Sequence, residues 1–292
     1  MIAHVGIVAK RGLVAAAPHL ESLVDWLAER GLSVTLDADT AALLDRRKGF
    51  AEVTRDELPA AVDLVVVLGG DGTLLAVADR VGQAGRDTPI MGVNFGRLGF
   101  LTEVTLPEML PALEAALAGT AQIQHRAMLH ARATLGAAGA VDHIVLNDVV
   151  VTKGAISRLI YLAVEVDGAF VTNVKADGLI IGSPTGSTAY NLAAGGPIVH
   201  PGVDALLITP IAPHTLGNRP IVIPGNCRIS VRPAVDSGKD EMFVTFDGQT
   251  GFPFGQGDAV DVTRADRVLR LVTSPTRGYY DTLRQKLHWG ER

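Results

Sequence analysis

One stretch constrains the fold of this chain more than any other: VDLVVVLGGDGTLLAVADR at Val62–Arg80. Its unbroken apolar run, Leu64–Leu68, is rich in β-branched residues, which is typical of a strand covered on both faces, as in a parallel sheet. A helix is predicted over Thr73–Ala78, directly after the glycines. Strand, glycine turn and helix form the layout of a phosphate-binding loop, because glycines let the backbone approach a ligand and the helix N-terminus offers free N–H groups.

Asp71 is the unusual residue of this loop, because it puts an anion where a phosphate is expected. The GGDG turn fits neither common phosphate loop: it lacks G-x-G-x-x-G, and no Lys-Ser/Thr follows the glycines. Asp71 could simply cap the helix, but capping needs one side chain, not three positions freed of Cβ atoms. A carboxylate beside a polyphosphate is useful if it binds Mg²⁺ or takes a proton from an attacking hydroxyl. The loop therefore predicts phosphoryl transfer.

The composition sets the class of protein. A chain of 292 residues can hold one large or two ordinary domains. Hydrophobic residues make up 48% and aromatic residues 5%, so we expect a core of Val, Leu, Ile and Ala. The net charge is −5 without a basic block, which argues against nucleic acid as the main partner. The single cysteine, Cys227, excludes an intramolecular disulfide and is typical of a reducing compartment.

Targeting and membrane segments are not expected. The first residues, MIAHVGIVAK, enter an apolar strand without a basic leader and a cleavage site. No segment approaches the ~18 apolar residues that a membrane span needs. We therefore expect a cytoplasmic protein with no membrane partner.

The first third of the chain alternates strands and helices. The predicted strands are 4–9, 32–37, 63–70 and 89–94, and the predicted helices are Leu20–Leu27 and Pro107–Ala118. This βαβ series predicts an α/β domain with a Rossmann-like parallel sheet and helices on its faces.

After Gly119 the pattern changes to period two. Apolar and polar residues alternate over Leu129–Leu135 and Ile160–Val166, which is typical of half-buried strands, and Asp167-Gly168 then supplies a hairpin turn. We therefore expect residues 120–275 to form a β-rich domain of two packed sheets.

The last segment, Tyr279–Trp289, is predicted to be a helix. The β-rich middle has no helical layer for it to join, so we expect it to return to the N-terminal domain. The α/β domain then comprises residues 1–119 and 276–292.

A second unusual loop lies at Lys175–Pro197, KADGLIIGSPTGSTAYNLAAGGP. Its hydroxyl-rich part precedes a predicted helix of small residues, Ala189–Ala194, which Ser187 or Thr188 can cap. Tyr190 offers a flat face for a nucleobase. A serine-rich connector is one alternative; a nucleophilic serine is another, although the G-x-S-x-G pattern is incomplete.

Three shorter segments complete the candidate site. Asn147-Asp148 stands where a strand begins, and a carboxamide beside a carboxylate can grip vicinal ribose hydroxyls or an adenine amino group. NFGRLGFLTE at Asn94–Glu103 is expected to pass close to the GGDG turn; the alternative is a tight turn followed by core residues. Asp247-Gly248 is either a turn or a ligand contact.

These loops, in this order, resemble the NAD kinases. The matching segments are GGDGT at Gly69–Thr73, NFGRLGFL at Asn94–Leu101, LNDVVV at Leu146–Val151, DGLIIGSPTGSTAYNLAAGGPI at Asp177–Ile198, ITPIAPHTLGNRPIV at Ile208–Val222 and FDGQ at Phe246–Gln249. GGDGT alone has little specificity, since lipid kinases of the diacylglycerol type look similar there. SPTGSTAY together with NDVVV is far more specific.

The resemblance implies an activity: transfer of the γ-phosphoryl group of ATP, or of a phosphoryl group of polyphosphate, to the 2′-hydroxyl of the adenosine ribose of NAD, with Mg²⁺ as the expected metal ion. Asp71 would activate that hydroxyl. The phosphate loop would consist of Gly69, Gly70, Gly72 and Thr73. The residues implied for nucleotide binding are Asp71, Gly72, Asn147, Asp148, Arg158, Lys175, Asp177, Thr185, Thr188, Ala189, Tyr190, Asn191, Leu192, Ala193 and Gln249. No direct protein ligand of the metal is identified.

The resemblance also implies a homo-oligomer, a dimer or tetramer, in which Lys175 and Asp177 serve a neighbouring subunit's site. The chain departs from the family at one position, since the family commonly shows Asn-Glu where this chain has Asn147-Asp148. The shorter carboxylate leaves open whether Asp148 touches the ribose directly or through water.

Two other functions remain as alternatives. A lipid kinase sharing the GGDGT loop would want an apolar acceptor pocket and a basic surface facing the membrane, and neither is visible in the sequence. A dinucleotide-sensing protein without turnover would gain nothing from an anion beside phosphate.

Overall fold

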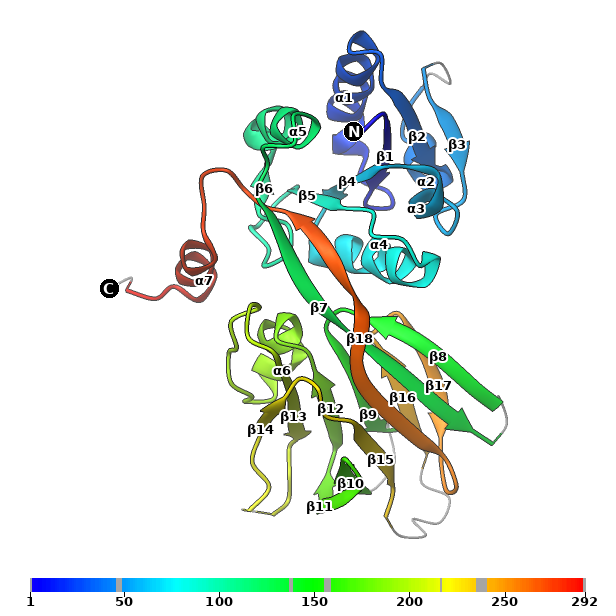
Figure 1. The fold of residues 1–292 in the computed structure, drawn as a ribbon, viewed down its shortest axis with the longest axis vertical. Coiled ribbons are helices and arrows are strands. Elements are labelled where there is room, and N and C mark those ends of the chain that lie inside the picture. Colours follow the sequence, from blue (N-terminus) through cyan, green and yellow to red (C-terminus); the bar gives the residue numbers. More distant parts are fainter. Residues whose placement is uncertain are drawn as a thin grey trace. The chain divides into compact units, whose positions relative to one another are not determined.

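Figure 1 shows the fold of the chain in its computed structural model. The structure describes residues 2–45, 49–136, 139–154, 159–215, 217–234 and 241–290. The chain divides into two compact units, Met1–His125 together with Leu269–Arg292, and Arg126–Val268. It passes from one unit to the other in two long strands, β7 (Ile123–Leu135) and β18 (Ala259–Val272).

The first unit is built on a parallel sheet in the order β3-β2-β1-β4-β5, with the end of β18 and the short β6 paired to β5. The strands are β1 (His4–Ala9), β2 (Ser33–Asp37), β3 (Ala51–Val53), β4 (Leu64–Gly69), β5 (Ile90–Asn94) and β6 (Val104–Thr105). Every residue of β4 and β5 is buried, so this run is covered on both faces, as the sequence predicts.

Helices cover both faces of this sheet (Figure 1). They are η1 (Val14–Ala16), α1 (Ala17–Glu29), α2 (Ala38–Ala41), α3 (Leu58–Ala61), α4 (Asp71–Ala84), η2 (Leu106–Glu108) and α5 (Met109–Leu117), where η denotes a 3₁₀ turn. The helices α1 and α5 share one apolar core with the strands, whereas α4 packs against α3, β4 and β5. In α1 the buried residues include Leu20 and Leu27, as their helical spacing predicts.

The predicted boundaries of α4 and α5 are wrong. The helix α4 extends past the predicted end at Ala78 and ends where Gly85 takes the left-handed conformation, with φ 67°. The helix α5 begins later than the predicted Pro107, because a 3₁₀ turn closed by a capping box between Thr105 and Glu108 precedes it.

The last helix, α7 (Tyr279–Leu287), belongs to the first unit. Its N-terminus is closed by Asp281, whose carboxylate accepts the backbone N–H of Gly278, and Leu283 is buried. The helix ends shortly before its predicted end, because His288 takes a left-handed conformation with φ 54°.

The second unit consists of two sheets. One is antiparallel in the order β14-β13-β12-β9-β16-β17. Its strands are β9 (Asp148–Lys153), β12 (Gly178–Gly182), β13 (Ala205–Ile211), β14 (Ile221–Pro224), β16 (Met242–Phe246) and β17 (Thr250–Phe254). The other runs β11-β10-β15-β18, with β18 also paired to β7 and β7 to β8. Its further strands are β8 (Gly139–Val145), β10 (Ile160–Val166), β11 (Ala169–Ala176) and β15 (Ile229–Pro233).

One apolar core joins these two sheets, which confirms the predicted β-rich part with two packed sheets. Along Leu129–Leu135 and Ile160–Val166, the buried residues alternate with more exposed ones, as predicted. The hairpin between β10 and β11 turns at Asp167 and Gly168, whose φ angles of 52° and 78° are those of a tight hairpin turn.

The limits of the second unit lie a few residues inside the 120–275 expected from the sequence, because the start of β7 and the end of β18 belong to the first unit. Among the described residues, none of the helices is long and apolar enough to cross a membrane.

Candidate functional site

The GGDG turn lies where β4 passes into α4. Gly69 ends the strand, Gly70 is the N-cap residue in an extended conformation, and Asp71 is the first helical residue. A carboxylate at this position interacts favourably with the positive end of the helix. The α4 N-cap is therefore a glycine, and the alternative that Asp71 acts as the N-cap residue is wrong.

The carboxylate of Asp71 binds the loop between β5 and β6. Oδ2 accepts the backbone N–H of Phe100 at 2.8 Å, and Oδ1 accepts that of Leu101 at 3.1 Å. Oδ1 also accepts the N–H of Thr102 at 3.0 Å and its hydroxyl at 2.9 Å. The prediction that NFGRLGFLTE passes close to the GGDG turn is confirmed.

The glycines around Asp71 fall into two groups. A Cβ atom at Gly99 would lie 1.9 Å from Oδ1 of Asp71, and one at Gly69 would lie 2.8 Å from Oγ1 of Thr73. These two glycines are required by close packing. A Cβ atom at Gly70 or Gly72 would have no neighbour within 4 Å, and neither residue needs a left-handed conformation. Nothing in the packing of the described residues explains these two, so they leave the backbone open to a ligand.

In the second unit, a cavity of about 310 Å³ gathers several of the predicted nucleotide contacts. It is lined by Asn147, Asp148, Val150, Thr152, Ala189, Tyr190, Thr245, Asp247 and Gly248. These residues come from β9, the start of α6 (Tyr190–Ala193), and β16 with its turn. Tyr190 is 45% exposed, so its ring is available for stacking on a base.

Asp247 anchors one wall of this cavity. Its carboxylate accepts the backbone N–H groups of Leu146 at 2.7 Å, Asn147 at 2.8 Å and Asp148 at 3.0 Å. The residue itself turns with φ 50°, which agrees with the turn predicted as one alternative for Asp247-Gly248, and it also lines the cavity. The Asp-Gly pair is visible in the sequence, but the hydrogen bonds from the Asp247 carboxylate to the start of β9 are not.

Asp148 is an acid of the cavity with a raised pKa. It is 5% exposed, and burial, followed by the charge of Asp247, raises its pKa to about 7. A carboxyl group of this kind is partly protonated near neutral pH, so it can donate a hydrogen bond as well as accept one.

The loop SPTGST packs against the same strand start. Ser183 donates its hydroxyl to the carbonyl of Leu146 at 2.5 Å, and its backbone N–H to that of Asn147 at 2.8 Å. A Cβ atom at Gly186 would lie 2.2 Å from the Asn147 carbonyl oxygen, so only glycine fits there. The loop thus places Thr185–Thr188, the 3₁₀ turn η3, directly beside the Asn147-Asp148 pair.

The predicted capping of the following helix is wrong. The N-cap residue of α6 is Ala189, and it lacks a side chain that could cap. Ser187 Oγ instead exchanges hydrogen bonds with the backbone of Val199, both at 3.0 Å. Thr188 donates to the carbonyl of Thr185 at 3.4 Å.

Asn191 lies inside the loop rather than on its surface. It is fully buried and donates to the carbonyls of Ser187 and Pro197, both at 3.0 Å, while its carbonyl oxygen accepts the hydroxyl of Thr209 at 2.6 Å. Its side chain therefore holds the loop together. The next residues of α6, Leu192 and Ala193, are partly and largely exposed.

Lys175, Asp177 and Gln249 lie in the second unit but are not among the residues that line this cavity. Lys175 on β11 has its Nζ 5.2 Å from the centre of the Tyr161 ring, and Asp177 pairs with Lys153 at 2.7 Å. Gln249 is exposed just after the Asp247 turn. Arg158 lies outside the described residues.

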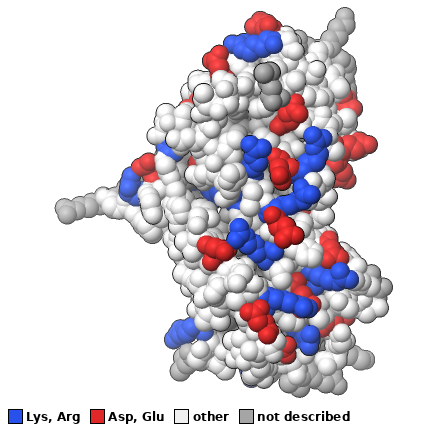
Figure 2. Space-filling view, viewed as in Figure 1, with Lys and Arg blue, Asp and Glu red and all other residues white. Residues whose placement is uncertain are grey.

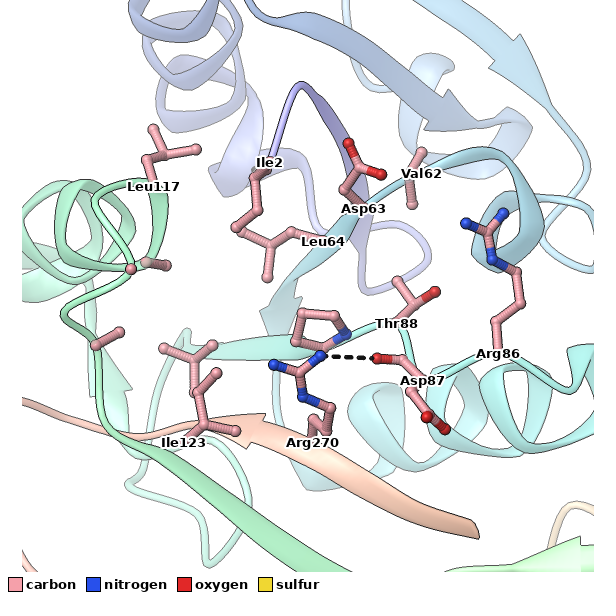
Figure 3. A pocket seen from close by; sticks show the side chains of 15 residues that line it. Ile2, Val62, Asp63, Leu64, Arg86, Asp87, Thr88, Leu117, Ile123 and Arg270 are labelled. Carbon is pink, nitrogen blue, oxygen red and sulfur yellow. Dashed lines mark hydrogen bonds between the residues drawn. The ribbon is translucent and has the colours of Figure 1, made fainter.

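A cavity of about 510 Å³ in the first unit contains none of the predicted site residues (Figure 3). Its lining includes Asp63 and Leu64 at the start of β4, and Arg270, which donates to the carbonyl of Asp87 at 3.5 Å. Ligands of open α/β sheets bind beyond the carboxyl ends of the strands. The GGDG turn is at that end of β4, and the cavity is at the other.

Comparisons with known proteins agree along most of the chain. The model of the ATP-NAD kinase N-terminal domain matches residues 5–121, and that of the ATP-NAD kinase C-terminal domain matches residues 146–274. A NAD kinase of Geotalea daltonii is 50% identical over 272 residues, which is 93% of each chain. A NAD kinase of Syntrophotalea carbinolica is 46% identical over 290 residues, which is 99% of each chain.

Two solved structures share the fold. The crystal structure of yeast NADH kinase complexed with NADH superimposes with a TM-score of 0.86 at 25% identity, covering 99% of this chain and 88% of that one. A NAD kinase from Archaeoglobus fulgidus in complex with ATP gives a TM-score of 0.75 at 24% identity, covering 97% of this chain and 99% of that one.

Proposed function

The chain belongs to the NAD kinase family, and on that premise we propose that it transfers the γ-phosphoryl group of ATP to the 2′-hydroxyl of the adenosine ribose of NAD. The observation that carries this proposal is the GGDG turn. Gly70 and Gly72 leave open backbone on both sides of Asp71, whose carboxylate is held by a second loop. Open backbone at a helix N-terminus suits phosphate, and a fixed carboxylate suits proton transfer.

We assign proton acceptance to Oδ2 of Asp71. A carboxylate offers about four acceptor positions, two on each oxygen. Oδ1 already accepts three hydrogen bonds from Leu101 and Thr102, whereas Oδ2 accepts one from Phe100. Oδ2 therefore keeps a position for the ribose hydroxyl, and the loop bonds hold the carboxylate still while the proton moves.

The cavity at Asn147 is the proposed acceptor site. Asn147 and Asp148 offer amide and carboxyl groups for ribose hydroxyls or the adenine amino group, and Tyr190 offers its exposed ring to the base. Half-protonated Asp148 can both donate and accept in such contacts.

The other predicted contacts are part of the proposal. Thr185, Thr188, Ala189, Leu192 and Ala193 would line the dinucleotide through the loop that packs on Asn147. We propose Gln249 as a neighbouring contact, and Lys175 and Asp177 as residues that serve the site of an adjoining subunit. Asn191 supports this loop from inside. The contact proposed for Arg158 stays a sequence prediction.

Mg²⁺ fits this site as a companion of the substrate phosphates. Among the described residues, no group of three or more His, Cys, Asp or Glu side chains could hold a metal ion. Mg²⁺ commonly keeps several waters and binds through substrate phosphates rather than a protein cage. When bound, it would neutralise charge on the transferring phosphoryl group.

ATP is the proposed donor, with inorganic polyphosphate as the alternative. The support for ATP is the Archaeoglobus fulgidus relative, which was solved in complex with ATP. The open GGDG backbone would accept either donor, because both present phosphate oxygens. A donor panel separates them.

A homo-oligomer in the cytoplasm is also proposed. The edge strands β11 and β14 expose the apolar side chains of Phe170 and Val222, which are 62% and 47% exposed. Exposed apolar edges are typical of association surfaces. The free Cys227 is compatible with a reducing compartment. Light scattering after gel filtration would measure the size of the assembly.

The two alternative functions have less support. A lipid kinase would want a basic face toward a membrane, whereas Figure 2 shows Lys and Arg interspersed with Asp and Glu over the visible face. A sensor without turnover would not need the carboxylate of Asp71 fixed beside open glycines.

The deciding experiment incubates the purified protein with MgATP and either NAD, NADH or diacylglycerol. We expect NADP to form from NAD, measured with an NADP-specific dehydrogenase. Phosphatidic acid instead of NADP would indicate a lipid kinase. Tight NAD binding by calorimetry without any product would indicate a sensor.

A further inference from the structure

The segment that leads from β18 into α7 is bonded to the loop that holds Asp71. Ser274 and Thr276 donate their hydroxyls to the carboxylate of Glu108, the first at 3.4 Å. Arg277 also donates to that carboxylate, and its Nη2 donates to the carbonyl oxygen of Glu103 at 2.8 Å. We call Ser274–Gly278 the C-terminal strap.

Glu108 is a permanent anchor for the strap. Burial alone would raise its pKa, but hydrogen bonds from Thr276, Thr105 and Arg277 lower it to about 2. Oε1 accepts the hydroxyls of Ser274 and Thr276, while Oε2 accepts Arg277 and closes the capping box with the N–H of Thr105 at 2.9 Å and its hydroxyl at 2.8 Å. The carboxylate therefore stays ionised and ties the strap to the segment that follows Glu103.

The bond from Arg277 reaches the carbonyl group of Glu103, the residue that follows Thr102. Thr102 is fully buried and gives both its N–H and its hydroxyl to Oδ1 of Asp71. Only the peptide group between Thr102 and Glu103 separates these bonds from the one to Arg277. A second contact leads to the same loop, because Lys286 of α7 has its Nζ 5.5 Å from the centre of the Phe100 ring.

We propose that Arg277 is a positioning residue for phosphoryl transfer, acting through Glu103 and Thr102 on the carboxylate of Asp71. This inference rests on the proposed function. An arginine suits the role because its planar head carries several N–H groups and can bond two acceptors at once. Loss of the bond to Glu103 leaves the loop free to shift, and the Oδ2 position then varies. The cavity at Asn147, proposed to hold the rest of NAD, is lined by no residue of this network.

The test compares three single variants with the wild type, together with the Arg277→Gln/Asp71→Asn double variant and Arg277→Ala. Arg277→Gln keeps a polar side chain but loses the double contact, and Asp71→Asn removes the carboxylate. Arg284→Gln is the matched control, because Arg284 on α7 pairs with the exposed Asp281 and not with the loop. Turnover, the Michaelis constants for NAD and ATP, and melting temperature are measured on each, with all assays well below the melting transition.

We expect Arg277→Gln to lower turnover at least ~10-fold while the Michaelis constant for NAD changes less than ~3-fold, a loss confined to the chemical step. Arg284→Gln should keep turnover within ~2-fold. In the Asp71→Asn background, Arg277→Gln should cause little further loss, since a residue that acts through Asp71 has nothing left to position. Millimolar guanidinium should restore part of the turnover of Arg277→Ala.

Other results would overturn the inference. If Arg277→Gln lowers the melting temperature but not turnover, Arg277 only attaches α7. If its effect multiplies with that of Asp71→Asn, it acts by a separate route. Amide hydrogen exchange at Phe100–Thr102 gives a readout without turnover, and we expect faster exchange in Arg277→Gln but not in Arg284→Gln. A wild type without NAD kinase activity but with this exchange pattern would refute the proposed function and leave the contact network intact.

Discussion

A Cβ atom on Gly99 would lie 1.9 Å from Oδ1 of Asp71, far inside contact distance. Two segments 28 residues apart in sequence thus meet without space between them, and the N–H groups of Phe100, Leu101 and Thr102 all turn to the same carboxylate. Position 99 must be glycine because the carboxylate of Asp71 occupies the space that a Cβ atom would need. The chemistry proposed for Asp71 therefore depends on a glycine of another loop.

Gly99→Ala should uncouple the two loops. The added methyl group forces either the carboxylate or the loop to move, which breaks some of the bonds to Asp71. We expect turnover to fall at least ~10-fold and the melting temperature to drop by several degrees, since each buried group left unpaired costs ~1–3 kcal/mol. Steady-state kinetics and thermal melts measure both. Wild-type turnover in Gly99→Ala would mean that the position of Asp71 does not matter.

Gly72→Ala, unlike Gly99→Ala, should not lower the melting temperature. The new Cβ meets no atom within 4 Å, and alanine is favoured over glycine in a helix by up to ~1 kcal/mol. We expect an unchanged or higher melting temperature together with a raised Michaelis constant for ATP, because the methyl group stands where phosphate approaches. An unchanged Michaelis constant for ATP would mean that ATP binds away from the GGDG turn.

Asp71→Asn should reduce turnover at least ~100-fold, because an amide cannot accept the proton of the ribose hydroxyl. NAD affinity should stay within ~10-fold. The side-chain NH₂ group of asparagine can only donate, and it would face backbone N–H groups of Phe100–Thr102 that also donate. We therefore expect the free energy of unfolding to fall by ~1–3 kcal/mol. Turnover, calorimetric NAD binding and melts on one preparation test this.

Asp63→Asn is the matched control for Asp71→Asn. Asp63 also accepts two backbone N–H groups, those of Ala3 at 2.9 Å and His4 at 3.0 Å, but it lies at the start of β4. Stability should fall here too, while turnover below the melting temperature stays near wild type. Equal turnover losses in both variants would remove the special role of Asp71.

Asp247→Ala should weaken the acceptor site selectively. Three N–H groups at the start of β9 lose their acceptor, so Asn147 and Asp148 move. We expect the Michaelis constant for NAD to rise at least ~10-fold and that for ATP to change less than ~3-fold.

Asp167→Ala provides the control for Asp247→Ala. Asp167 also precedes a glycine, has a similar φ of 52°, and accepts the N–H of Arg228 at 2.8 Å, yet it turns the β10–β11 hairpin. Backbone strain from alanine is thus equal in the two variants. If Asp167→Ala raises the Michaelis constant for NAD as much as Asp247→Ala does, a general loss of order in the second unit explains both effects.

The stability of the protein should carry a pH signature of Asp148. Its pKa is raised to about 7 in the folded state, above the usual value of 3.8, so the folded state binds the proton more tightly than the unfolded chain. The contribution of the protonated Asp148 carboxyl group to the free energy of unfolding is fully present below pH 4 and is lost as the pH rises through about 7. The loss is at most ~4 kcal/mol.

Asp148→Asn removes that titration. Between pH 5 and pH 8, the melting temperature of the wild type should fall relative to that of Asp148→Asn, measured in buffers of matched ionic strength. Parallel curves for the two proteins would show that Asp148 titrates at an ordinary carboxyl pKa.

The sequence by itself determined the parts of this protein that depend on neighbours along the chain. The apolar run before Gly69 predicts a buried parallel strand, the period-two stretches such as Leu129–Leu135 predict the two-sheet part, and both are confirmed. The order of the glycine-rich loops led to the NAD kinase family, which the comparisons confirm. Periodicity and turn chemistry act over a few residues, so a single sequence displays them directly.

Only the tertiary structure decided which partners the candidate residues have. Asp71 is bonded to residues about thirty positions away, and Asp247 to residues about a hundred positions away. Asn191 belongs by its position to the binding loop, yet folding buries it and uses its amide for internal bonds. An Asp or Asn side chain can cap, turn, anchor or catalyse, and these roles have the same local signature. The choice among them depends on which backbone groups the packed sheets bring within about 3 Å, a property of the whole fold.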